Sequence, residues 1–189
     1  MDKKHNNTEE KASFCCDTVS TLKKEVRIEY LYLDLKTCDR CVGTDAVLDE
    51  VVGLIKPTLE LAGYHVQYEK REITTAQFAQ KYRFVSSPTI HVNGQDIFDT
   101  VTESDCGCCG EIAGVQVDCR TYEYDGKTYE VPTKEMLADA ILKKVFRPTG
   151  LTNVKLLKYE LPDNLKRFFE GKERKAAASC CCSGGGDCC

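Results

Sequence analysis

The chain lacks the features that mark membrane, secreted and nucleic-acid-binding proteins. Its 189 residues include no tryptophan, two methionines and three histidines, and no apolar run approaches the roughly eighteen residues of a membrane span. The first ten residues are polar and contain no apolar segment of the kind found in a signal peptide. A net charge of -4 gives no basis for nucleic-acid binding. We therefore expect a cytoplasmic protein with no membrane span and no nucleic acid among its partners.

Cysteine is abundant where those features are scarce. The chain has 13 cysteines, an odd number in a sequence without a secretion signal, so we expect most of the thiols to be reduced at rest. With three histidines, sulfur is the dominant metal ligand, and thiolates select soft ions over hard ones. The cysteines fall into groups, which indicates shared ligands or shared electrons. These groups are Cys15 with Cys16; Cys38 with Cys41; Cys106, Cys108, Cys109 and Cys119; and Cys180, Cys181, Cys182, Cys188 and Cys189.

The central motif is Lys36-Thr-Cys-Asp-Arg-Cys-Val-Gly43, which follows a strand-like run and opens a helical pattern. At the start of a helix, Cys38 and Cys41 can face one point and close a small disulfide, which in a cytosolic βα context indicates a redox dithiol. Cys38 would lie among unpaired N–H groups at the positive end of the helix dipole, which favours its thiolate. Arg40 adds to this effect and Asp39 opposes it. The alternative is an unrelated fold in which the pair is half of a zinc site.

A second motif, Ser86-Ser-Pro-Thr-Ile-His-Val-Asn-Gly-Gln-Asp-Ile97, predicts a proline-led strand, a tight turn at Asn93-Gly94 and a returning strand. A strand that begins directly after Ser87-Pro88 resembles the cis-proline loop of thioredoxins and glutaredoxins. The resemblance implies an α/β thioredoxin-like fold with a βαβα-ββ-α core. It also implies that Cys38 attacks a disulfide and Cys41 resolves the mixed disulfide. Pro88 would then lie opposite the dithiol, and the backbone of Ser87 would pair with the substrate.

Four features of the sequence depart from the pattern of thioredoxins and glutaredoxins. No tryptophan precedes Cys38, and Asp39-Arg40 stands where thioredoxins carry Gly-Pro and glutaredoxins carry Pro-Tyr. Tyr32 occupies the place of the buried acid of thioredoxin, with Asp34 two residues later. Asp99-Thr100 replaces the glycine pair beside which glutaredoxins bind glutathione. These differences argue against general protein-disulfide reduction and against the use of glutathione.

The remaining patterns divide the chain into four parts. We expect a mobile N-terminal segment at residues 1–24, a thioredoxin-like domain at 25–147 with an insertion at 99–132, an extension with a short helix at 148–178, and a flexible cysteine-rich tail at 179–189. Further elements are expected as a strand at His65–Ile73, helices at Thr75–Arg83, Lys134–Phe146 and Asn164–Ala178, and a hairpin at Val117–Val131 that turns at Asp125-Gly126.

The insertion contains Asp105-Cys-Gly-Cys-Cys-Gly110, which we expect to be a flexible loop. The resemblance to thioredoxins and glutaredoxins implies that the strand Thr89–Val92 starts beside the dithiol. The antiparallel strand Gln95–Phe98 would then return toward it, so the chain after Asp99 should emerge at the active-site end. The thiols of the insertion can there meet Cys38. Three uses of these thiols remain open: tetrahedral zinc binding, a soft-ion or relay site, and a simple disulfide. The thiols in question are Cys106, Cys108, Cys109 and Cys119.

The tail thiols indicate capture of a soft ion. Trivalent arsenic prefers three thiolates and mercuric ion two or three, and the glycine-linked groups Cys180-Cys181-Cys182 and Cys188-Cys189 can fold round such an ion without a rigid scaffold. The alternative is a tail with no specific ligand. Cys15 and Cys16 have two interpretations of equal weight: they take part in the thiol chemistry, or they are incidental thiols without a role.

Several stretches together resemble small bacterial and archaeal thioredoxin-like proteins of uncharacterised function, often associated with arsenic or heavy-metal resistance genes. The matching stretches are residues 31–41, 86–94, the cysteine-rich insertion, residues 159–169 and the cysteine tail. The resemblance implies a protein that binds and transfers, or reduces, a soft metal or metalloid such as arsenic(III) or mercury(II). The dithiol itself requires no cofactor. Expected partners are a thiol reductant, either thioredoxin or a low-molecular-weight thiol, or a metal-resistance protein.

Two other classes of function remain open. The first is a thiol-disulfide oxidoreductase that uses Cys38 and Cys41, with the other cysteines as an internal electron relay. The second is a purely structural zinc protein, against which the tail argues because it offers no rigid ligand geometry.

Overall fold

The computed structural model describes residues 24–147 and 158–181, with side chains as far as Ala178. The predictions for Cys15, Cys16, Cys182, Cys188 and Cys189 fall outside these residues, as do those for the side chains of Cys180 and Cys181. In the described part of the chain, no helix has the combination of length and hydropathy that crossing a bilayer requires.

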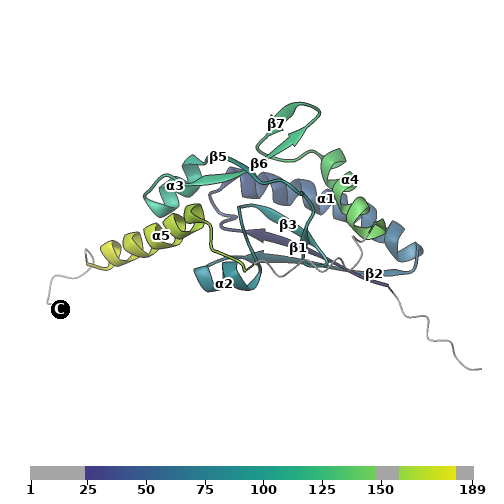
Figure 1. The fold of residues 1–189 in the computed structure, drawn as a ribbon, viewed down its shortest axis with the longest axis horizontal. Helices are drawn as coiled ribbons and strands as arrows, with labels where there is room; N and C mark the ends of the chain where they lie inside the picture. The colour runs from purple at the N-terminus through teal and green to yellow at the C-terminus, as the bar shows by residue number, and fades with distance from the viewer. Residues whose placement is uncertain (1–23, 148–157, 182–189) are drawn as a thin grey trace, which may run out of the picture.

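A mixed sheet of four strands forms the centre of the molecule (Figure 1). Its order is β2 (Tyr64–Glu72), β1 (Lys24–Tyr32), β3 (Thr89–Val92) and β4 (Gln95–Asp96). β1 pairs with β2 in parallel and with β3 in the antiparallel sense. Because β1 lies between two neighbours, its apolar residues are buried on both faces, as the sequence predicts.

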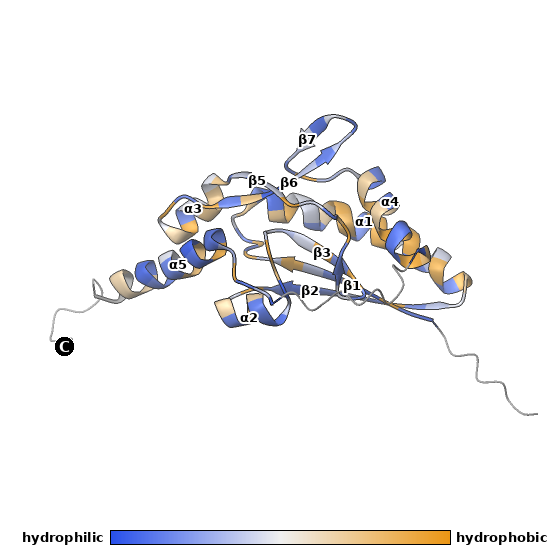
Figure 2. Cartoon of the chain, viewed as in Figure 1, coloured by the Kyte–Doolittle hydropathy of each residue, from blue (hydrophilic) through white to orange (hydrophobic). Residues whose placement is uncertain are grey.

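Two helices cover one face of this sheet. α1 (Asp39–Leu61) and α4 (Lys134–Phe146) contribute Leu48, Val52 and Ile141 to a core shared with Ile28 of β1. Hydrophobic and hydrophilic residues alternate along both helices (Figure 2), as expected for helices with one buried side. α4 has the predicted bounds and is capped by the hydroxyl of Thr133, which accepts a hydrogen bond from the backbone N–H of Met136.

The cis-proline prediction is confirmed: the Ser87–Pro88 peptide bond is cis and immediately precedes β3. Asn93 and Gly94 both have positive φ angles, as a tight hairpin turn requires, and β4 returns from it. β4 is shorter than the predicted strand and ends at Asp96. The short helix before the loop, α2 (Ala76–Lys81), is also present and begins after Thr75.

The insertion is ordered into a second sheet and a helix. Strands β5 (Thr102–Asp105), β6 (Asp118–Tyr124) and β7 (Lys127–Tyr129) pair in that order, and α3 (Gly107–Ala113) connects the first two. The predicted hairpin turn at Asp125-Gly126 is confirmed. The prediction of a flexible cysteine loop was wrong, because Cys106 caps α3 and its N–H donates to the carbonyl oxygen of Val117 at 2.9 Å.

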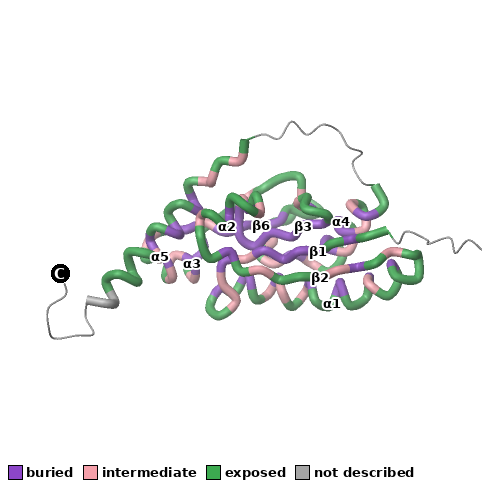
Figure 3. The backbone as a smooth tube through the Cα atoms, turned by 90° about the horizontal axis from the view of Figure 1, so that it is seen from below, coloured by how far each residue is buried: buried purple, intermediate pink, exposed green. Residues whose placement is uncertain are grey.

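A second core joins the insertion to the C-terminal helix α5 (Asp163–Cys181). Leu165, Phe168 and Phe169 pack among the buried cysteines, whereas residues 173–178 of α5 are exposed (Figure 3). The prediction that this helix ends at Ala178 was wrong, because the helical backbone continues to Cys181. α5 therefore seals the cysteine-rich region and projects away from it.

Candidate metal centre

Four thiols from distant parts of the chain converge in the second core. The Sγ atoms of Cys38, Cys106, Cys109 and Cys119 all lie within 4.8 Å of one another. The Sγ atoms of Cys109 and Cys38 lie 3.7 Å apart, and those of Cys119 and Cys109 lie 3.3 Å apart. Four sulfurs around tetrahedral zinc at about 2.3 Å would lie about 3.8 Å apart. The cluster therefore has the ligand type, number and spacing of a four-thiolate metal centre.

Local structure places each of these side chains. Cys38 is the N-cap of α1 and Cys106 the N-cap of α3, and neither cap is made by a side-chain hydrogen bond. Cys109 lies in the first turn of α3, and Cys119 on β6 pairs with Ser104 of β5. Two of the thiols thus sit where helix N–H groups are unpaired and favour negative charge.

The thiols are buried and mutually hydrogen-bonded. Cys38, Cys109 and Cys119 are 0% exposed and Cys106 is 5% exposed. The thiol of Cys119 donates to Cys109, and that of Cys109 donates to Cys38, so Cys38 is the acceptor at the end of the chain. None of the six cysteines with described side chains forms a disulfide.

This pattern separates the acidities of the four thiols. Hydrogen bonds from Cys106, Cys109 and Cys119 lower the pKa of Cys38, and hydrogen bonds from Cys109 and Cys119 lower the pKa of Cys106 to about 7. Hydrogen bonding to Cys106, with burial, raises the pKa values of Cys109 and Cys119. Cys38 is therefore the most acidic thiol of the cluster, and Cys109 and Cys119 are less acidic than an ordinary thiol, so an incoming ion has to displace their protons.

Asp34 shapes the loop that presents Cys38. Its Oδ1 accepts hydrogen bonds from the backbone N–H groups of Lys36, Thr37 and Cys38 at 2.9, 2.6 and 3.2 Å. Burial acts to raise the pKa of Asp34, but hydrogen bonds from these residues outweigh it and lower the pKa overall. This carboxylate, which the sequence marked only as displaced from the thioredoxin position, fixes the turn before α1.

Arg40 braces the centre from outside the sulfur cluster. Its guanidinium donates to the backbone carbonyls of Cys119 at 3.0 Å, Ser104 at 3.0 Å and Asp105 at 2.8 Å, and it also pairs with Glu130. The side chain is buried, at 6% exposure. Arg40 on α1 thus holds β6, which carries Cys119, and β5, which immediately precedes Cys106.

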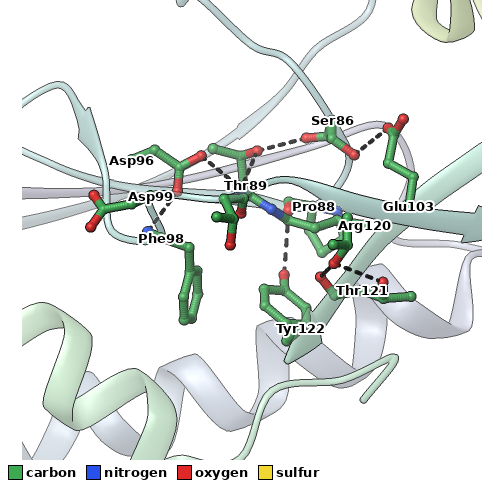
Figure 4. Close-up of polar contacts among 12 residues, drawn as sticks. Ser86, Pro88, Thr89, Asp96, Phe98, Asp99, Glu103, Arg120, Thr121 and Tyr122 are labelled. Atoms are coloured by element: carbon green, nitrogen blue, oxygen red, sulfur yellow. Dashed lines mark hydrogen bonds and ion pairs between the residues drawn. The ribbon is translucent and has the colours of Figure 1, made fainter. Parts of the chain in front are cut away.

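The cis-proline loop contacts Cys41 and is covered by β6. Ser87 Oγ lies 3.3 Å from Cys41 Sγ, and the carbonyl oxygen of Ser87 accepts a hydrogen bond from the N–H of Arg120 at 2.7 Å. The hydroxyl of Tyr122 donates to the carbonyl of Pro88, as Figure 4 shows. The backbone acceptor at Ser87, which the resemblance reserved for a substrate, is therefore bonded to the insertion.

Arg120 itself is a fully buried side chain of this region. Its guanidinium pairs with Asp96 at 2.7 Å and donates to Thr89 Oγ1 at 3.1 Å (Figure 4). The ion pair ties β6 to β4, and the hydrogen bond to Thr89 ties it to β3. The insertion and the cis-proline loop thus form one packed unit.

The predicted site cysteines whose side chains are described separate into three sets. The prediction that thiols of the insertion meet Cys38 is confirmed. Cys108 is not part of the cluster; it points toward Asp39, at 3.8 Å from Oδ2, and Cys38 takes the fourth place. Cys41 is buried beside the cluster and outside it.

Sequence reasoning missed the structural roles of Arg40 and Arg120. Arg40 was interpreted only as a neighbour that helps Cys38 ionise, and Arg120 was not singled out. The guanidinium of Arg40 donates to Cys119, 79 residues along the chain, and that of Arg120 donates to Thr89, 31 residues away in sequence. No local sequence pattern marks contacts between residues so far apart in the chain. The placement of Arg40 between two cysteines is the one signal that pointed to its region.

The fold and the site define an α/β protein with a mixed four-stranded sheet and a buried four-cysteine cluster suited to a metal ion. The chain belongs to the family described as domain of unknown function DUF2703, which it matches over residues 26–141. All four clustered cysteines lie within that span. An uncharacterized protein of Archaeoglobus fulgidus is 29% identical over 117 residues, which cover 60% of this chain and 82% of that protein. No solved structure matches the chain.

Proposed function

We propose that this protein binds a thiophilic metal ion through Cys38, Cys106, Cys109 and Cys119 and exchanges it with other thiols. The observation that carries the proposal is the convergence of four buried Sγ atoms within 4.8 Å. A single buried thiol packs as a small apolar side chain, but four whose sulfurs converge on one point also form a complete ligand set for a tetrahedral ion.

Charge and geometry support a soft divalent ion. Four thiolates around such an ion carry two net negative charges, which the N-termini of α1 and α3 partly offset. The tetrahedral arrangement suits zinc and its heavier relatives. Arsenic(III) and mercury(II), which need two or three thiolates, would use a subset of the cluster, and these are the ions that the proposed role in metal resistance involves.

Exchange would deliver the ion to, or accept it from, a low-molecular-weight thiol or a metal-resistance partner protein in the reducing cytoplasm. The tail cysteines would collect soft ions for the centre. The family resemblance and the grouping of the cysteines support the exchange of the ion with other thiols. The buried cluster would be the site at which the ion is held.

Cobalt and zinc titrations of the reduced full chain test the proposal. Cobalt(II) should bind with one equivalent and give the intense thiolate charge-transfer absorption of a four-sulfur site, and zinc should displace it. The matched pair of variants is Cys109→Ser and Cys108→Ser, neighbours on α3 of which only Cys109 joins the cluster. Cys109→Ser should weaken binding and change the spectrum, whereas Cys108→Ser should do neither. Equal effects of both substitutions, or no saturable binding, would refute the proposal.

Thiol-disulfide exchange on a thioredoxin-like fold is the second candidate. The cis Ser87–Pro88 bond beside Cys41 and the strand order β2-β1-β3-β4 favour it. The complete burial of Cys38 and the hydrogen bond that occupies the Ser87 carbonyl oppose it. The two candidates separate experimentally: exchange predicts that metal-free protein reduces a protein disulfide and loses this activity in Cys41→Ser, whereas metal binding predicts no turnover.

A further inference from the structure

Cys38 belongs to two chemical groups at once. It is a member of the four-thiol cluster and also the first cysteine of the Cys38-x-x-Cys41 pair, whose second cysteine lies buried in the first turn of the helix that Cys38 caps. Each other member of the cluster has only fellow members as its described hydrogen-bonded thiol neighbours. A bond between Cys38 and Cys41 would therefore remove one ligand from the centre and leave the other three in place.

Resting on the proposed function, we propose that hydrogen peroxide discharges the metal from this centre by joining Cys38 to Cys41. The site would then act as a peroxide-responsive store of a soft metal ion. Metal binding and oxidation of the dithiol exclude each other, because the same sulfur cannot be a thiolate ligand and part of a disulfide.

The reaction has two balanced steps. The Cys38 thiolate attacks one oxygen of hydrogen peroxide, the O–O bond breaks, and Cys38 becomes a sulfenic acid as hydroxide leaves. The thiol of Cys41 then attacks the sulfur of Cys38, the S–O bond breaks, the disulfide forms, and water carries away the proton of Cys41. The two sulfurs together lose two electrons, which the peroxide gains. The ion is left with Cys106, Cys109 and Cys119 and exchanges more readily.

Burial selects the oxidant. Cys38 and Cys41 are both 0% exposed, and β6 covers the cis-proline loop beside them through the hydrogen bond from Arg120 to Ser87. A disulfide reagent such as oxidised glutathione must bring its own sulfur into line with the attacked thiolate, which this covering prevents. Hydrogen peroxide is small and uncharged, so an opening of the insertion much smaller than the one that oxidised glutathione needs admits it to the sulfur.

Zinc-loaded full-length protein is the sample that tests this inference. Wild-type, Cys41→Ser and Cys108→Ser proteins are exposed to a small excess of hydrogen peroxide, zinc release is followed with a chromogenic chelator, and disulfides are mapped by peptide mass spectrometry. Wild type and Cys108→Ser should lose their zinc as a Cys38–Cys41 disulfide forms, and a dithiol reductant should restore binding. Cys41→Ser should retain its zinc over the same period. Oxidised glutathione should release little zinc from any of them.

The outcomes separate this inference from the function on which it rests. Failure of reduced wild type to bind zinc would refute the metal centre itself. Zinc binding followed by equal release from wild type and Cys41→Ser, or a disulfide mapped to Cys106 and Cys109, would overturn the switch alone. If Cys41→Ser does not fold, the mapped pairing in wild type and the behaviour of Cys41→Ala decide the question. Release by oxidised glutathione as fast as by peroxide would overturn the selection by burial.

Discussion

The guanidinium of Arg40 donates a hydrogen bond to the carbonyl oxygen of Cys119 at 3.0 Å, across 79 residues of sequence. Through this bond, the helix that presents Cys38 fixes the strand that carries the most distant member of the cluster. Metal ligands depend on such supporting groups, because a thiolate that is free to move binds its ion less tightly. Arg40 is thus a positioning residue for the centre rather than a ligand.

Replacement of Arg40 by lysine should weaken metal binding. Lysine keeps the positive charge but cannot reach several carbonyl groups at once, so we expect the affinity for zinc to fall by about 10- to 100-fold. Competition with a chelator of known affinity measures the change. Arg71→Lys is the control, since Arg71 lies on β2 and pairs with Glu69, which is neither a member of the cluster nor on an element that carries one. A loss of stability without any loss of affinity would show that Arg40 is structural only.

Metal affinity should depend on pH more steeply on the acid side of neutrality. The pKa of Cys106 is lowered to about 7 by hydrogen bonds from Cys109 and Cys119, whereas the pKa values of Cys109 and Cys119 are raised. Above pH 7, the binding ion displaces the protons of Cys109 and Cys119. Below pH 7, it must also displace the proton of Cys106. Affinity should therefore fall as pH falls, with a steeper slope below about 7. A plot of log affinity against pH with a constant slope would contradict this assignment.

The sequence predicted the parts of the fold that local patterns encode. The Asn93-Gly94 turn and the closing helix α4 follow from turn chemistry, capping and periodicity, whereas the cis Ser87–Pro88 bond follows from the resemblance to thioredoxins and glutaredoxins. The approach of the insertion to Cys38 followed from the resemblance and topology together. The resembling fold starts the strand after the cis-proline beside the dithiol, and an antiparallel strand then returns the chain to that end.

Long-range contacts explain what the sequence did not predict. The membership of the cluster depends on α3, where Cys106 and Cys109 face Cys38 and Cys108 faces Asp39. Glycines in Asp105-Cys-Gly-Cys-Cys-Gly110 indicated a flexible loop, but packing against α5 makes it helical. A short glycine-containing helix is stable only with such a partner, and no local signal reveals that partner.

Gly171 permits the contact between α3 and α5 on which this helix depends. A Cβ atom there would lie 2.3 Å from the carbonyl oxygen of Ala113, so Gly171→Ala should separate the two helices. We expect thermal unfolding at a lower temperature and weaker zinc binding. Gly53→Ala is the control within α1, where nothing lies within 4 Å, and helix propensity should raise stability by up to about 1 kcal/mol. Equal stability of the two variants would show that the helices adjust without cost.

Removal of the tail should separate the two groups of metal-binding thiols. A chain that ends at Ala178 keeps all four clustered cysteines and also Gly171 and Lys175, through which α5 contacts α3. It should therefore bind one zinc ion as the full chain does. The full chain should take up additional arsenite or mercuric ion in the presence of glutathione, because Cys180, Cys181, Cys182, Cys188 and Cys189 add five thiols.

Native mass spectrometry of the two reduced chains measures both stoichiometries. Arsenite adducts of equal number and stability in the two chains would refute the capture role of the tail and leave the buried centre unaffected. Loss of zinc on truncation would instead show that the centre needs the end of α5. Because the ligands of the centre precede α5 and pack only against its first turns, we expect the truncated chain to retain its zinc and to lose the additional arsenite.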